Sequence, residues 1–102
     1  MRLSDDQINA RLPKLQGWSR TGDALTRTFA FRSFADAAAF VLRVAFEAEA
    51  NDHHPDVAWS FKKVSLSWST HSDGGITEKD FDGAAAADRI ASSTPQSTAQ
   101  KS

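Results

Sequence analysis

The run from residue 34 to about residue 51 constrains the fold of this chain more than any other stretch. It is rich in Ala, contains neither Gly nor Pro, and follows Ser33, a residue typical of a helix N-cap. Apolar residues recur at helical spacing on one face, namely Phe34, Ala37, Val41, Val44 and Ala48, with Phe40 and Ala45 beside them. Asn51 suits the end of a helix, and Pro55 cannot continue it. A helix this long and amphipathic must cover another layer of structure.

Two pairs of alternating stretches flank this helix and predict two β-hairpins. The pairs are residues 17–21 with 24–32, and residues 57–61 with 64–68. Gly22-Asp23 forms the turn of the first hairpin and Lys62-Lys63 the turn of the second. In the second hairpin we expect Phe61 to pack against other residues, and Trp68 to be more buried than Trp59.

Shorter helices are expected at both ends of the chain. Ser4 and Gln7 form a capping-box pattern for the first, which Pro13 ends or bends. Thr77 and Asp80 repeat the pattern for a helix that runs to about residue 90 or 91. The order α-β-β-α-β-β-α predicts an α+β fold, a four-stranded antiparallel sheet with helices packed on one face.

Length and composition place these elements in one domain, residues 1–91, followed by a polar tail at 92–102 that we expect to be disordered. The net charge of -1, without basic runs, argues against nucleic acid as a partner. The absence of cysteine excludes disulfides, thiolate metal sites and cysteine nucleophiles. No apolar run is long enough to cross a membrane, and the cytoplasm is the expected location.

Histidines are the strongest candidates for chemistry, because imidazole titrates near neutral pH. The chain has three: His53 and His54 follow the long helix, and His71 ends a strand-like run, residues 65–71, just before a Gly-Gly turn. Glu49 and Asp52 stand near the first two, and these carboxylates together with the helix C-terminus favour an imidazolium. Adjacent residues in an extended segment point to opposite sides, so His53 and His54 need not share one role.

Three interpretations of this cluster remain open from the residues alone. The histidines could simply cap the helix and hydrogen-bond the following loop. They could bind zinc together with a carboxylate, although adjacent histidines rarely ligate one ion. They could also serve as a general acid and a general base, since an imidazolium beside a neutral imidazole supplies both at pH 7.

A resemblance to a known family separates these interpretations. The matching residues are Glu49, His53-His54-Pro55, Phe61, His71 and Asp80, with every gap in register, together with Gly17-Trp18, Arg43-Val44-Ala45, Ser69-Thr70 and residues 75–79. This pattern resembles that of the pterin-4a-carbinolamine dehydratases over roughly residues 3–91. The resemblance implies dehydration of 4a-hydroxytetrahydropterin (4a-hydroxytetrahydrobiopterin in the biopterin series) to the quinonoid dihydropterin. That step recycles the pterin used by aromatic amino-acid hydroxylases.

The resemblance also implies roles for individual residues. His53, His54 and His71 would be catalytic, with His53 and His71 moving protons and His54 positioning the pterin. Glu49 and Asp52 would orient and charge the imidazoles, and Pro55, Trp18 and Asp80 would support or bind the substrate. A Trp early in a strand, such as Trp18, is more often a core residue, and Asp80 could be only a helix cap. Neither a metal nor a cofactor is expected, because the pterin is the substrate.

Two further expectations follow from the resemblance. Members of the family assemble as homodimers or homotetramers, and a functional link to an aromatic amino-acid hydroxylase is implied. A non-catalytic binding or assembly module of the same fold is the alternative function, and the three intact histidines favour the enzyme over it.

Overall fold

The computed structural model describes residues 1–96 of the 102 in the chain. Its elements are α1 (Asp5–Arg11), a 3-10 turn (Leu12–Lys14), β1 (Ser19–Thr21), β2 (Ala24–Ala30), α2 (Phe34–Asn51), β3 (Asp56–Ser60), β4 (Lys63–Trp68), a second 3-10 turn (His71–Asp73) and α3 (Glu78–Ser92). The predicted order of helices and strands is therefore confirmed.

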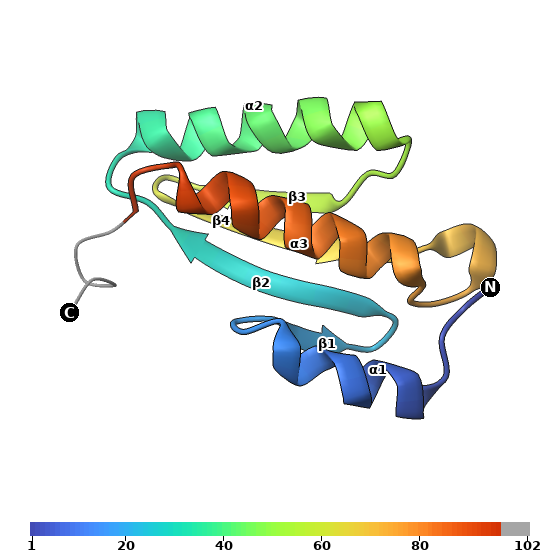
Figure 1. Ribbon diagram of the computed structural model, residues 1–102. Helices are drawn as coiled ribbons and strands as arrows, with labels where there is room; N and C mark the ends of the chain where they lie inside the picture. Colours follow the sequence, from blue (N-terminus) through green and yellow to red (C-terminus); the bar gives the residue numbers. More distant parts are fainter. Residues whose placement is uncertain (97–102) are drawn as a thin grey trace.

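The four strands form one antiparallel sheet in the order β1-β2-β4-β3. Helices α2 and α3 lie side by side across one face of this sheet (Figure 1). Phe29, Val64 and Leu66 point into the core on that face, and each is at most 1% exposed. On the opposite face Thr28 hydrogen-bonds Ser65 at 2.7 Å. The predicted α+β fold, with one apolar and one polar sheet face, is confirmed.

Capping residues set the starts of all three helices. Ser4 with Gln7 and Thr77 with Asp80 form complete capping boxes, as predicted. Ser33 accepts a hydrogen bond from the backbone N–H of Asp36 at 3.0 Å. Each N-cap residue supplies a side-chain oxygen to a backbone N–H that has no partner within the helix.

Three side chains that were expected to pack are more exposed than predicted. Phe34 and Ala45 of α2 are exposed, because the apolar face that packs on the sheet consists of Ala37, Phe40, Val44 and Ala48. Phe61 is 65% exposed and occupies the β3–β4 turn, which lies one residue earlier than predicted. Its φ of 52° suits the two-residue turn of a hairpin.

The edge strand β3 remains open to solvent along its whole length. Trp59 is 41% exposed, whereas Trp68 on the neighbouring strand is 3% exposed, as predicted. The rings of Phe34 and Trp59 stack with their centroids 5.0 Å apart, and the ring of Phe61 lies 6.5 Å from that of Phe34. Together with Val57, these side chains form an exposed apolar cluster, which we call the β3 edge cluster.

The packed part of the chain continues beyond residue 91, where the polar tail was expected to begin. Ser92 is the last residue of α3, and Thr94 is 6% exposed. Arg43 of α2 donates to the hydroxyls of Ser93 and Thr94 at 2.9 and 3.3 Å. The rest of the expected tail, residues 97–102, lies outside the described residues. Within the described chain, no helix is both long and apolar enough to cross a membrane.

Candidate active site

The C-terminus of α2 determines where the histidine pair begins. The backbone N–H of His53 donates to the carbonyl of Ala48 at 3.1 Å, and that of Asp52 donates to the carbonyl of Glu49 at 3.3 Å. Asp52, the residue directly before His53, adopts the left-handed conformation, with φ of 50°. This is the Schellman arrangement, which ends the helix and turns the chain sharply. His53 therefore leaves α2 in a direction fixed by backbone hydrogen bonds.

His53 points inward and meets a buried carboxylate. Its Nε2 lies 2.6 Å from Oδ1 of Asp80, which is fully buried in the first turn of α3. The side chain of His53 is 13% exposed. A neutral imidazole that donates from Nε2 to this carboxylate keeps Nδ1 free as a proton acceptor. The pair thus orients a histidine that can act as a base, or as an acid once it is protonated.

Asp80 is held by a second set of hydrogen bonds on its other oxygen. Oδ2 accepts from the hydroxyl of Thr70 at 2.8 Å and from the backbone N–H of Thr77 at 2.9 Å. The Thr77 hydroxyl lies 2.8 Å from that of Thr70 and accepts from the backbone N–H of Lys79. Every polar group of this buried network has a partner, as such networks require to be stable. Asp80 therefore caps α3 and also orients His53.

The same network fixes the chain directly before the third histidine. Thr70 donates to Asp80, and His71 is the next residue. The strand predicted to reach His71 ends earlier, at Trp68, and His71 begins a 3-10 turn with an exposed side chain. Thr70 and Gly75 pair across this turn and close the loop between them. Asp80 thus connects the segment that carries His53 and His54 with the segment that carries His71.

His54 occupies a different environment from its neighbour. Its Nε2 lies 2.6 Å from Oε1 of Glu49, in a pair whose side chains are 53% and 76% exposed. Glu49 therefore contacts one of the two imidazoles. Asp52 is exposed at the helix end, and Pro55 follows the pair in the link to β3.

The indole ring of Trp68 packs against His53, and Gly83 leaves the space that this indole occupies. The rings of His53 and Trp68 stack with centroids 5.6 Å apart. Gly83 of α3 lies so close to this indole that a Cβ added to it would come within 2.6 Å of ring carbons. A larger residue at position 83 would thus displace Trp68 and with it the imidazole. Sequence reasoning missed Gly83, although a Gly inside a predicted helix is a signal of close approach.

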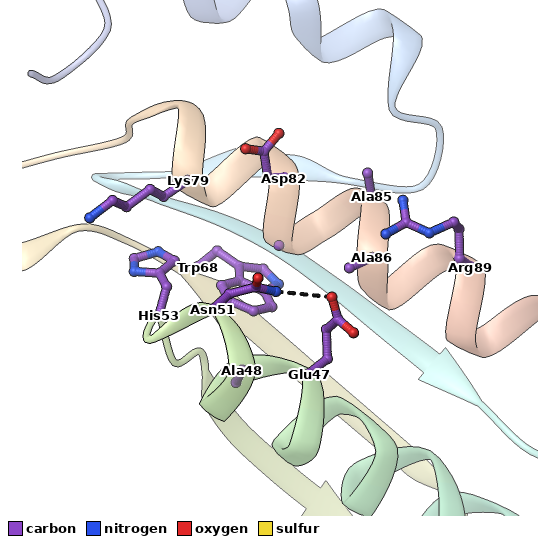
Figure 2. Close-up of a pocket in the computed structure, with 11 residues that line it drawn as sticks. Glu47, Ala48, Asn51, His53, Trp68, Lys79, Asp82, Ala85, Ala86 and Arg89 are labelled. Atoms are coloured by element: carbon purple, nitrogen blue, oxygen red, sulfur yellow. Dashed lines mark hydrogen bonds between the residues drawn. The ribbon is translucent and has the colours of Figure 1, made fainter.

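A cavity of about 420 Å³ opens between α2 and α3 beside His53 (Figure 2). It is lined by Glu47, Ala48, Asn51, His53, Trp68, Lys79, Asp82, Gly83, Ala85, Ala86 and Arg89. Of the predicted site residues only His53 is among them. Most of the other lining residues were not predicted, because they meet only where α2 packs against α3.

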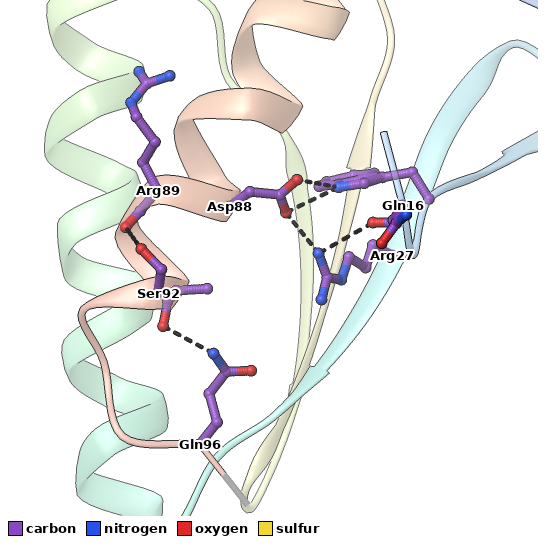
Figure 3. Close-up of polar contacts among 8 residues, drawn as sticks. Gln16, Arg27, Asp88, Arg89, Ser92 and Gln96 are labelled. Atoms are coloured by element: carbon purple, nitrogen blue, oxygen red, sulfur yellow. Dashed lines mark hydrogen bonds and ion pairs between the residues drawn. The ribbon is translucent and has the colours of Figure 1, made fainter. Parts of the chain in front are cut away.

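Trp18 lies away from this cavity and is 6% exposed. Its indole N–H donates to both carboxylate oxygens of Asp88, at 3.0 and 3.1 Å. Arg27 reaches the same carboxylate at 2.8 Å (Figure 3). This second cluster joins β2 to α3 and ties Trp18 into the core. Among residues 1–96, no group of three or more His, Asp or Glu side chains is arranged to hold a metal ion.

Comparison with known proteins establishes the family. The family model for pterin 4 alpha carbinolamine dehydratase matches residues 1–90. This chain is a member of that family. A pterin-4-alpha-carbinolamine dehydratase homologue from Roseiflexus sp. (strain RS-1) is 52% identical over 89 residues, which are 87% of this chain and 96% of the homologue. One from Mycobacterium sp. (strain KMS) is 49% identical over 86% of this chain and 94% of its own length. Dehydratases of this kind are hydro-lyases, and the chain is an enzyme of this class.

Two solved structures resemble the fold of this dehydratase family member. A transcriptional coactivator/pterin dehydratase from Brucella melitensis superposes with a TM-score of 0.86 at 35% identity, covering 89% of this chain and 99% of its own. A pterin dehydratase-like protein described as a RuBisCO assembly factor in the alpha-carboxysome superposes with a TM-score of 0.66 at 27% identity, covering 78% and 94%.

Proposed function

We propose that this protein dehydrates a 4a-hydroxytetrahydropterin to the quinonoid dihydropterin by histidine-based general acid–base catalysis. The observation that carries the proposal is the contact of His53 with the buried Asp80. His53 also lines the cavity, and the chain belongs to the dehydratase family. An imidazole oriented in this way is suited to proton transfer near neutral pH.

The reaction needs two proton transfers and no net change in protons or electrons. An acid protonates the hydroxyl on C4a, the C4a–O bond breaks and water leaves. The lone pair of N5 forms the new C=N double bond, and a base removes the proton from N5. We assign the two transfers to His53 and His71, and the positioning of the pterin to His54, supported by Glu49. This chemistry requires neither a metal nor a redox cofactor.

The dehydration assay is the direct test. The 4a-carbinolamine is generated in situ with a phenylalanine hydroxylase, and its decay is followed by ultraviolet absorbance with and without the protein between pH 6 and 9. We expect decay that accelerates in proportion to protein concentration. His53→Ala and His71→Ala should abolish most of the acceleration while the circular dichroism spectrum stays unchanged. An unaltered rate in both variants would remove the catalytic assignment.

We also propose that the protein is a homodimer or homotetramer. The β3 edge cluster supports this, because an open edge strand that carries exposed aromatic side chains favours pairing with another chain. Light scattering coupled to size exclusion should give a mass of two or four times 11.1 kDa. Trp59→Lys should shift the equilibrium towards the monomer. A monomeric wild type at micromolar concentration would contradict this part of the proposal.

An assembly role is the second candidate. It rests on the fold shared with the pterin dehydratase-like RuBisCO assembly factor. The two candidates differ in what His53→Ala does: an assembly role that uses the β3 edge cluster should survive this substitution, whereas dehydration should not.

A further inference from the structure

The groove between α2 and α3 extends well beyond the imidazole of His53. On α3 its wall runs from Lys79 to Arg89, ten residues apart, which is about 15 Å along a helix axis. The helices are antiparallel, so the wall on α2 runs the opposite way, from Asn51 to Glu47 (Figures 1 and 2). A groove of this length offers more room than the reacting atoms alone require.

Small residues keep the middle of the groove open. Ala48 faces it from α2, and Gly83, Ala85 and Ala86 face it from α3. Ala86 is 5% exposed and Ala48 is 2% exposed, so they form the floor between the two helices. Side chains of ordinary size at these positions would fill the space.

A cation lines each end of the groove, Lys79 beside His53 and Arg89 at the far end. At the end away from His53, Arg89 lines the groove and Arg43 of α2 lies close to the last turn of α3, where it binds the hydroxyls of Ser93 and Thr94. Neither guanidinium makes an ion pair with a described residue. The acidic residue on the α2 wall, Glu47, accepts a hydrogen bond from Asn51 at 2.9 Å. The remaining carboxylate, Asp82, points away from α2 in Figure 2. The far end therefore offers the Arg89 guanidinium to an anion, and the Glu47 carboxylate on the α2 wall is held by Asn51.

The connectivity of a pterin leads its substituent into this groove. C6, which carries the substituent, is bonded directly to N5, and N5 is bonded to C4a, the two atoms at which protons move. A substituent on C6 must therefore start next to the histidine that transfers the proton. A three-carbon substituent spans roughly 4.5 Å, which is less than a third of the groove.

We propose that the groove binds the C6 substituent of the pterin, and that it selects a long substituent with an anionic end, carboxylate or phosphate, which Arg89 recognises. This inference rests on the proposed function. It makes Ala86 and Arg89 specificity-determining residues, since neither is needed for the proton transfers.

Binding of stable 7,8-dihydropterins to the full chain tests the inference by calorimetry. The probes are the 6-methyl compound, 7,8-dihydrofolate as the carboxylate, and a dihydropterin with a phosphorylated three-carbon chain on C6. At least one anionic probe should bind about ten-fold more tightly than the 6-methyl compound, because a charge-assisted hydrogen bond contributes that much. Which of the two does so identifies the anion.

Substitutions then locate the effect. Arg89→Gln should remove the advantage of the anionic probe and leave the 6-methyl affinity unchanged within two-fold. Lys14→Gln, an exposed cation on the first 3-10 turn, is the matched control and should change neither. Ala86→Leu should weaken the extended probes only. Because Ala86 is buried, Ala85→Leu at a half-buried position of the same wall gives the same test with less effect on folding.

Equal affinities of the wild type for all three probes would overturn the inference. So would an Arg89→Gln variant that behaves as Lys14→Gln does. Failure of the proposed function would look different: the protein would not accelerate dehydration of the 6-methyl carbinolamine, which makes no use of the groove. The ratio of binding constants would still decide whether the groove binds the substituent.

Discussion

His53 and His54 are adjacent in the chain and make the same contact, an Nε2 atom 2.6 Å from a carboxylate oxygen, in two opposite environments. Asp80, the partner of His53, is fully buried and hydrogen-bonded on both oxygens. Glu49, the partner of His54, is largely exposed. Solvent screens the second pair, and its contribution to stability is small. The first pair cannot lose a partner without leaving polar groups buried and unpaired. The comparison shows that a distance alone does not tell what an ion pair contributes.

The largest effect is expected from removing the two carboxylates in turn. Asp80→Ala leaves His53, the Thr70 hydroxyl and the Thr77 N–H without their acceptor, and should lower the free energy of unfolding by about 3 kcal/mol. Glu49→Ala should lower it by less than about 0.5 kcal/mol. Urea unfolding followed by tryptophan fluorescence measures both. Equal losses of unfolding free energy would show that burial does not determine what each pair contributes to stability.

Catalysis should separate the two histidines nearly as strongly. His53→Ala removes the oriented acid–base group and should lower kcat on the order of 100-fold. His54→Ala should raise KM while kcat falls much less, because we assign it to positioning. Initial rates of dehydration over a range of pterin concentrations measure the two constants. A larger fall in kcat for His54→Ala would exchange the roles.

A smaller loss of stability is expected from removing the Thr70 hydroxyl that donates to Asp80. Thr70→Val keeps the shape of the side chain and removes the hydroxyl that donates to Oδ2, which should cost about 1.5 kcal/mol. Thr28→Val is the matched control, since Thr28 makes a hydrogen bond at 2.7 Å to Ser65 on the exposed sheet face. Thermal unfolding of the two variants compares them. A control that loses as much as Thr70→Val would mean that the network adds nothing beyond one hydrogen bond.

The smallest effect should come from the turn at Asp52, directly before the two histidines. Asp52 adopts φ of 50°, so Asp52→Val should cost about 1 kcal/mol, whereas Asp52→Gly should cost nothing. Asp52→Asn removes the charge and keeps the conformation. The pH dependence of kcat/KM separates the two effects: a profile that shifts in Asp52→Asn would show that the charge acts on the histidines. An unshifted profile would assign Asp52 to the turn alone.

Local patterns in the sequence were enough to predict most of the architecture. Hairpin alternation, capping boxes at Ser4 and Thr77, and the uninterrupted run before Asn51 are properties of short segments. Prediction failed where the outcome depends on distant segments. Phe34 fits the apolar face of α2 by spacing. It is nevertheless exposed, because it lies beside the edge strand β3 and stacks on Trp59 instead of packing in the core.

The candidate site shows the same division between local and distant information. The histidines and Glu49 were singled out by residue type and spacing, and Asp80 by the resemblance to the family. The contact of Glu49 with His54 follows from the end of one helix. By contrast, Asp80 could be read from sequence as a helix cap, and nothing local indicated that its second oxygen would meet His53, 27 residues away.

The elements, their order and the supply of imidazole and carboxylate groups follow from local sequence, because each depends on backbone preferences and side-chain chemistry within a few residues. The packing of the chain settles which histidine meets the buried carboxylate of Asp80, and that Ala86 and Arg89 share a groove with it. Those outcomes depend on how α3 packs against α2 and β4. That packing is set by close contacts such as Gly83 against Trp68, between segments far apart in the chain.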